Sequence, residues 1–111
     1  MKFAIFVGAL LLASQAHAIG SVTAHVVQVR VDASGTGMVF FDQPVVGSPS
    51  ACGQDSAYKS AFAFGATPAG KNILAFALFA KATNATVTVY GSGACTVYGD
   101  YVEDWSYGQL Q

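Results

Sequence analysis

The segment TPAGKNILAFALFAK, residues 67–81, decides the fold, because it carries the helical signals of the chain. Thr67 can cap a free backbone amide, and Pro68 is tolerated at the first helical position, where no backbone donor is needed. Between Lys71 and Lys81 only the ends are polar, and eight consecutive residues at 73–80 are apolar. The segment therefore predicts a helix that is hydrophobic on every side.

Such a helix needs more cover than one small sheet provides, because a sheet contacts only one stripe of it. Phe76 or Phe79 and their neighbours then require another surface. A partner subunit would supply that surface, so we expect a homo-oligomer with Phe76 and Phe79 at its interface. Alternatively, loops cover the far side of the helix or its alanines stay exposed, and the chain is a monomer.

Three β-prone segments precede the helix, at 22–31, 38–41 and 58–64. In the first of them, VTAHVVQVRV, the alternation of apolar and polar residues slips at Val26 and Val27, which predicts a bend or bulge. Turn residues at 32–37 separate the first two strands, which should form a hairpin. The prolines and glycines at 43–55 predict a loop before the third strand.

Two more strands are predicted after the helix, at 85–90 and 101–107. Val87 and Val89 face inward in the first of them. The second places four side chains on one face: Tyr101, Glu103, Trp105 and Tyr107. The order β-β-β-α-β-β is mainly β with one helix and fits a five-stranded Greek-key barrel of the OB-fold type.

The first residues have the pattern of a secretory signal peptide. Residues 1–18 combine one basic residue, an apolar run at 3–13, and Ala16 and Ala18 at the positions that signal peptidase reads. A transmembrane helix needs about 20 apolar residues, and this run is shorter. We expect cleavage after Ala18, one domain at 19–111, no transmembrane segment, and a secreted or periplasmic location.

The sequence contains two cysteines, Cys52 and Cys95. In an exported chain, paired thiols oxidise and stay oxidised, so we expect one disulfide between them. By the chain-entropy estimate, closing a loop of this length stabilises the fold by about 4 kcal/mol. Two unpaired thiols are the alternative.

Composition argues against several classes of function. Residues 19–111 carry four basic and six acidic side chains, so they lack the positive surface of a nucleic-acid-binding protein. Gly65 to Lys71 has the glycine and lysine spacing of a Walker A loop, but Asn72 lacks the hydroxyl that holds magnesium, and Pro68 lacks a backbone donor. We therefore predict neither nucleotide nor nucleic-acid binding, and no cofactor.

Catalytic and metal-binding arrangements are also poorly represented. Gly91-Ser92-Gly93 departs from the Gly-x-Ser-x-Gly pattern of a nucleophile elbow. His25 is the only histidine of residues 19–111, so no metal set is expected. A Cys95–His25 pair would be the one nucleophilic alternative to the disulfide. We expect the protein not to be an enzyme.

Aromatic residues gather near the C-terminus, at Tyr90, Tyr98, Tyr101, Trp105 and Tyr107. Tyrosine and tryptophan combine an apolar ring with a polar edge, which suits sugar rings and protein interfaces. Tyr101, Trp105 and Tyr107 are accordingly the candidate ligand-binding residues. Packing in the core or against another subunit is the alternative for Trp105.

Four features carry a family resemblance: Cys52, the Gly70-Lys71 helix entry, the apolar helix and VTVYGSGAC at 87–95. In these features the sequence resembles small secreted proteins related to the B subunit of subtilase cytotoxin. The resemblance implies an OB-fold. In the toxins of that family, five B subunits form a ring, and their helices line its centre. The ring binds cell-surface glycans and carries a separate catalytic subunit. Ser21 matches their sugar-binding serine only loosely in position, so that site is not carried over.

The leading hypothesis is a secreted, non-enzymatic module that recognises a cell-surface glycan or a partner protein. The homo-oligomer would then be a pentamer if the family resemblance extends to assembly. The second hypothesis is a structural subunit that only forms an oligomer or docks to another secreted chain. Binding of single-stranded nucleic acid, a common use of the OB-fold, conflicts with the few scattered basic residues.

Overall fold

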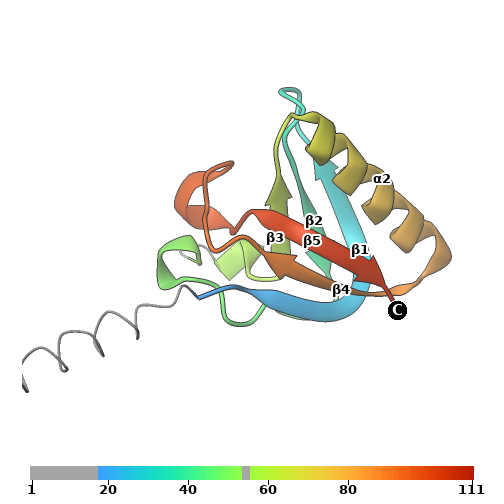
Figure 1. Cartoon of the computed structure of the whole chain (residues 1–111), viewed down its shortest axis with the longest axis horizontal. Helices are drawn as coiled ribbons and strands as arrows, with labels where there is room; N and C mark the ends of the chain where they lie inside the picture. The colour runs from blue at the N-terminus through green and yellow to red at the C-terminus, as the bar shows by residue number, and fades with distance from the viewer. Residues whose placement is uncertain (1–17, 54–55) are drawn as a thin grey trace, which may run out of the picture.

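The computed structural model describes residues 18–53 and 56–111 of the chain (Figure 1). The predicted signal peptide lies almost wholly outside the described residues. These residues form five strands, one α-helix and three short 3-10 helices: β1 (Ser21–Val31), β2 (Gly37–Phe41), η1 (Ser50–Cys52), η2 (Ser56–Tyr58), β3 (Ala61–Phe64), α2 (Pro68–Thr83), β4 (Thr86–Gly91), η3 (Gly99–Tyr101) and β5 (Trp105–Leu110).

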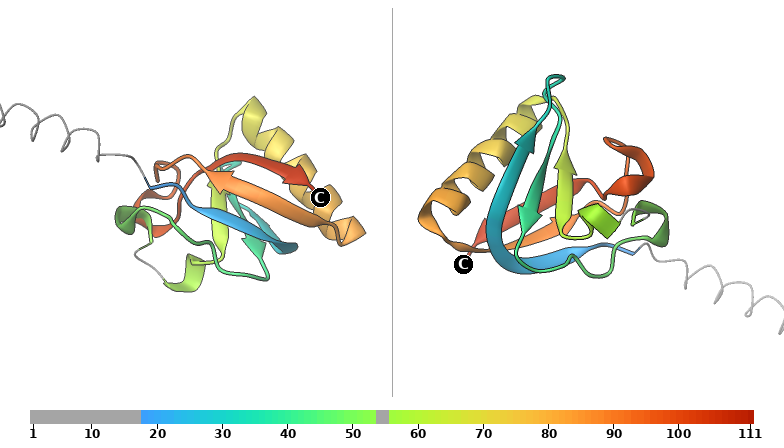
Figure 2. Two further views of the ribbon diagram at one scale, coloured as in Figure 1. Left: turned by 60° about the horizontal axis from the view of Figure 1, so that its bottom comes forward. Right: turned by 180° about the vertical axis from the view of Figure 1, so that it is seen from behind.

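The five strands form one antiparallel sheet in the order β3-β2-β1-β4-β5. β1 is central because its first half pairs with β4 and its second half with β2. The pairing shifts between Val26 and Gln28, which confirms the bulge predicted from the adjacent valines. Figure 2 shows the strong bend of β1 that follows. The predicted hairpin of the first two strands is also confirmed.

The sheet is not closed into the barrel that the sequence predicts. Among the described residues, backbone pairing between the two sheet edges is limited to an isolated parallel bridge between Ala63 of β3 and Asp104, the residue before β5, where the Ala63 amide donates to the Glu103 carbonyl at 2.9 Å. β3 has four residues, and β5 begins just after this bridge. The two strands therefore have no shared ladder that would complete a barrel.

The helix begins as the sequence predicts. The Thr67 side chain accepts a hydrogen bond from the Gly70 amide at 3.0 Å, and Pro68 occupies the first turn. At the other end Asn84 caps the helix with a left-handed backbone, φ 54°. Ala77 and Ala80 are fully buried, so small side chains bring α2 close to the sheet. Among the residues that the structure describes, no helix is both long and apolar enough to span a membrane.

The main core lies between α2 and the sheet. It contains buried residues from all five strands and from α2, among them Val39, Phe62, Val87, Val89 and Trp105. The predicted inward direction of Val87 and Val89 is confirmed. A second, smaller cluster covers the opposite side of β2 and β3, with Met38, Ala61, Ala63 and Val102 buried. β3 is therefore buried on both faces.

The third and the last strand start several residues later than predicted, and the last one continues to Leu110 rather than Tyr107. The third strand starts at Ala61 rather than Tyr58, because the preceding residues form η2. The last strand starts at Trp105, and Tyr101 belongs to η3. The register also shifts opposite Tyr90 and Gly91, so one residue of β5 bulges and the faces of Trp105 and Tyr107 differ. The single face predicted for the four side chains of 101–107 is therefore wrong.

Candidate functional site

The loops after β2 and after β4 gather at the end of the molecule away from α2, as both views in Figure 2 show. They enclose a cavity of about 430 Å³, within the size range of small-molecule sites. Its walls include Ser48, Cys52, Tyr58, Lys59, Tyr101 and Glu103. The cavity therefore combines aromatic rings, a hydroxyl, an ammonium group and a carboxylate.

Glu103 forms part of the cavity wall and is almost completely buried, with 2% of its surface exposed. Its carboxylate accepts hydrogen bonds from the Gly20 amide at 3.1 and 3.2 Å, the Ser48 hydroxyl at 2.6 Å and the Gly93 amide at 2.8 Å. These donors come from three segments that are far apart in the sequence. One carboxylate thus joins the start of β1, the loop after β2 and the turn after β4.

Glycines make room for this carboxylate. A Cβ atom at Gly20 or Gly91 would overlap the Glu103 side chain. Gly93, which donates to Glu103, has a φ of 82°, in the left-handed region that favours glycine. The glycines of the segment 89–95 therefore serve the backbone geometry around Glu103.

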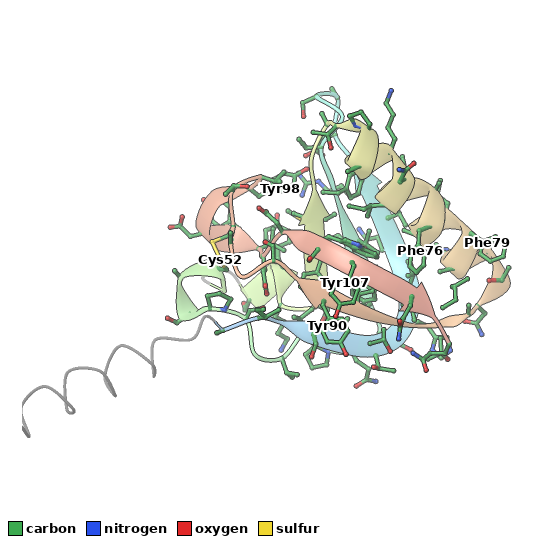
Figure 3. The ribbon with its side chains drawn as sticks, viewed as in Figure 1. Cys52, Phe76, Phe79, Tyr90, Tyr98 and Tyr107 are labelled. Atoms are coloured by element: carbon green, nitrogen blue, oxygen red, sulfur yellow. A yellow bond between two sulfur atoms is a disulfide. The ribbon has the colours of Figure 1, made fainter. Side chains whose placement is uncertain are left out.

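The predicted disulfide between Cys52 and Cys95 is confirmed, with Cα atoms 5.5 Å apart (Figure 3). It joins η1, which lines the cavity, to the loop after β4. Because Cys95 is in a disulfide, the alternative of a Cys95–His25 nucleophilic pair is excluded. Glu103 and the disulfide together fix the cavity walls.

Two tyrosines line the cavity. Tyr58 of η2 and Tyr101 of η3 lie with ring centroids 6.4 Å apart, and Tyr101 is 53% exposed. Lys59, next to Tyr58, is also exposed. Four residues of the cavity wall were not predicted as site residues, because their approach to one another depends on loops whose paths the sequence pattern does not specify. They are Ser48, Tyr58, Lys59 and Glu103.

A polar cluster holds the loop after β4 against the β1–β2 turn. The Arg30 guanidinium donates to both carboxylate oxygens of Asp32 at 2.8 and 3.2 Å and lies 5.5 Å from the centre of the Tyr98 ring. The Tyr98 hydroxyl donates to Asp32 and lies 3.1 Å from the Thr36 hydroxyl. The hydrogen bonds from Arg30 and then Tyr98 lower the pKa of Asp32. Burial, followed by the bond to Asp32, raises the pKa of Tyr98.

The outer surface of β4 and β5 carries a second pair of tyrosines. The rings of Tyr90 and Tyr107 are stacked, with centroids 4.8 Å apart and an angle of 24° between them (Figure 3). Tyr107 is 56% exposed. This pair lies on the opposite side of the sheet from the main core.

The three predicted ligand-binding residues thus occupy three different places. Tyr101 lines the cavity, Tyr107 lies on the outer sheet surface, and Trp105 is buried in the core. Trp105 contacts Phe41, Phe62 and Phe76, so its ring is not available to a ligand.

The two predicted interface residues also differ in environment. The Phe76 ring packs against Trp105 at 5.7 Å, whereas Phe79 is 56% exposed on the far side of α2 (Figure 3). Leu78 is 51% exposed beside it. The exposed apolar surface expected for this helix is therefore formed by Leu78 and Phe79, without Phe76.

His25 lies on β1 and has two side-chain neighbours. Its Nδ1 atom lies 3.2 Å from the Asp42 carboxylate, and its Nε2 atom lies 3.3 Å from the Thr86 hydroxyl. Across residues 18–53 and 56–111, no three His, Cys, Asp or Glu side chains come together as a metal site.

Comparison with known proteins adds no relative. No protein-family model matches the chain, and no curated protein or solved structure matches it.

Proposed function

We propose that this chain is a secreted, non-enzymatic module that binds a glycan in the cavity beside the disulfide. The observation that carries the proposal is the pairing of two tyrosine rings with Ser48 and Lys59 in one cavity. Ring faces pack against the apolar faces of sugars. The Lys59 ammonium group can donate to sugar oxygens, and the Ser48 oxygen, whose hydrogen is donated to Glu103, can accept from a sugar hydroxyl. A partner protein that inserts a side chain into the same cavity is the alternative ligand.

The rigidity of the cavity supports a binding role. The Glu103 carboxylate accepts hydrogen bonds from three segments of the chain around the cavity, and the disulfide fixes η1. A site that is ordered before the ligand arrives loses less conformational entropy on binding. This smaller loss of conformational entropy matters most for ligands that bind weakly, such as sugars.

The proposed architecture is a partly open OB-fold barrel of the toxin B-subunit type. The Ala63–Asp104 bridge supports it, because this contact brings the two edge strands together. The pattern at 87–95 and the apolar helix carry the family resemblance. The signal pattern at 1–18 supports secretion, and the disulfide is compatible with it.

A glycan array probed with the oxidised, secreted protein tests the proposal. We expect binding to a restricted set of glycans, and Tyr101→Ala should weaken it at least tenfold, which corresponds to about 1.4 kcal/mol. Tyr101→Phe keeps the ring and should lose less. Val27→Ala, at an exposed position on β1, is the control. Absence of any bound glycan, or unchanged binding by Tyr101→Ala, would contradict the proposal.

A structural subunit is the second candidate function. The exposed Leu78 and Phe79 favour it, because a second chain that covers an apolar patch removes it from water and so stabilises the assembly. The two functions are compatible, since an oligomer can also present several glycan sites.

A further inference from the structure

We propose that the glycan is a neutral oligosaccharide, which extends from the cavity along the side of β2 and β3 that faces away from the main core. Four side chains form this path, which we name the β2–β3 strip: Tyr101, Tyr58, Phe40 and Gln28. This inference rests on the proposed glycan-binding function and specifies the kind of glycan. A single sugar would need only the cavity.

The cavity and the β2–β3 strip share residues. Tyr58 and Tyr101 line the cavity, and the Tyr58 ring also contacts Phe40, with ring centroids 6.2 Å apart. Ala61 is a further part of the cavity wall, and it pairs directly with Phe40 of β2. Side chains that lie opposite each other on neighbouring strands share a face of the sheet. The strip therefore begins at the cavity wall.

The register of the sheet continues the strip by one strand. Phe40 pairs with Ala61 on one side and with Gln28 of β1 on the other. Val29 packs against the main core, so its neighbour Gln28 points to the opposite face, the same face as Phe40. Because neighbouring strands are roughly 4.8 Å apart, Gln28 lies about 10 Å from Ala61. This distance is longer than one sugar ring.

The strip is open to solvent and held in place from below. Tyr101 is 53% exposed, and Gln28 at the other end is also exposed. Phe40 and Tyr58 between them are half-buried, because both rings pack on the second, smaller cluster. Rings that are already fixed lose little conformational entropy when a ligand covers them. The strip therefore presents a preformed aromatic surface.

The charged groups beside the strip form a neutral pair. Arg30 lies two residues from Gln28 on the same face, pairs with both carboxylate oxygens of Asp32, and interacts with the Tyr58 hydroxyl. The side chains of Arg30 and Asp32 remain 40% and 29% exposed. A guanidinium donor beside a carboxylate acceptor matches sugar hydroxyls, which both donate and accept. A nucleic acid would instead require uncompensated cations along its phosphates.

The test is an array of linear, uncharged glycans of one to six residues, in separate series of glucose, galactose, mannose and N-acetylglucosamine. We expect affinity to rise at least about tenfold between the shortest and longest bound members of a series. Phe40→Leu keeps apolar cover over the second cluster but removes the ring. It should abolish most of this rise and leave binding of the shortest member unchanged.

Gln28→Ala tests the far end of the strip at an exposed position where the fold is not at risk. It should lower the affinity of the longest members by roughly threefold, as expected for the loss of one exposed hydrogen bond. Gln109→Ala, the same substitution at an exposed position of β5, is the matched control and should change no affinity. Tyr101→Ala should weaken binding at every length.

The outcomes separate the two proposals. Affinity that does not depend on length overturns the extended site while the cavity stands. A length dependence that Phe40→Leu and Gln28→Ala both leave intact overturns it too, as does equal weakening of short and long glycans by these variants. Failure of the wild-type protein to bind any member contradicts glycan binding itself. If Phe40→Leu does not fold, the comparison of Gln28→Ala with Gln109→Ala decides.

Discussion

At the scale of single residues, Glu103 organises more of the chain than any nearby sequence pattern indicates. Its carboxylate binds donors at Gly20, Ser48 and Gly93, while the next side chain, Asp104, accepts from the backbone amides of Thr96 and Val97. Neighbouring carboxylates therefore serve two separate purposes. One fixes the cavity wall, and the other fixes the loop that carries the disulfide.

Removal of the Glu103 carboxylate should strongly destabilise the protein. In Glu103→Ala, two backbone amides and one hydroxyl lose their acceptor in a buried place, and we expect the free energy of unfolding to fall by roughly 3 kcal/mol. Urea denaturation measures this fall. Asp100→Ala, at an exposed acidic position, is the control and should change stability little. A loss for Glu103→Ala no larger than that of the control would show that the three hydrogen bonds are dispensable.

The Asp32 cluster should make stability depend on pH. Because its pKa is lower in the folded protein than its ordinary value near 3.8, Asp32 contributes stability above that value, and this contribution is lost as pH falls through the folded pKa. We expect Asp32→Asn to be less stable than wild type at pH 7 and the difference to shrink below about pH 4. Thermal unfolding from pH 7 to pH 2 measures the two curves. Parallel curves would show that Asp32 does not carry this dependence.

At the scale of the elements, sequence pattern predicts what is local and misses what is set by distant contacts. The bulge at Val26 and Val27 is visible because two adjacent valines break the alternation. The irregularity in β5 is not visible, because Trp105 and Tyr107 keep a regular spacing and the shift appears only in the pairing with β4. For the same reason the role of Glu103 could not be predicted, since its hydrogen-bond partner Gly20 is 83 residues away in the sequence.

The start of α2 offers a direct test of such a distant contact. Helix propensity alone predicts that Gly70→Ala stabilises the helix by about 1 kcal/mol. In the structure, however, a Cβ atom at Gly70 would overlap the Gly65 carbonyl oxygen. We therefore expect Gly70→Ala to lower the free energy of unfolding by about 2 kcal/mol. Ala69→Gly, at an exposed position in the same turn, should cost about 1 kcal/mol or less by propensity alone. A stabilised Gly70→Ala would contradict the close approach.

This contact also explains the near-match to a phosphate-binding loop. The two glycines of the segment 65–71 lie against each other, because Gly70 packs on the backbone of Gly65. Their spacing therefore has a structural cause. The similarity to a nucleotide-binding motif needs no ligand to account for it.

At the scale of the whole molecule, the two ends differ in character. α2 with its exposed Leu78 and Phe79 forms one end, and the loops with the cavity and the disulfide form the other (Figure 1). The mainly β class with one helix could be predicted from periodicity and capping residues. The open sheet could not, because closure depends on how far β3 and β5 extend toward each other, and both begin later than their patterns suggest.

The separation of the two ends leads to a prediction about assembly. If Leu78 and Phe79 are the contact between subunits, native mass spectrometry of the secreted protein should detect a closed oligomer, with five chains if the toxin resemblance extends to assembly. The double variant Leu78→Ser/Phe79→Ser should dissociate it into folded monomers, since both side chains are half exposed and make little intramolecular contribution.

Phe76→Ala provides the contrast within the same helix. Its ring packs against Trp105, so this variant should lose roughly 3 kcal/mol of folding stability rather than act specifically on assembly. Glycan binding in the cavity should survive the dissociation with its intrinsic affinity unchanged, because the cavity lies at the other end of the molecule. A wild-type protein that stays monomeric at high concentration would contradict the structural-subunit function and leave the cavity as the principal candidate site.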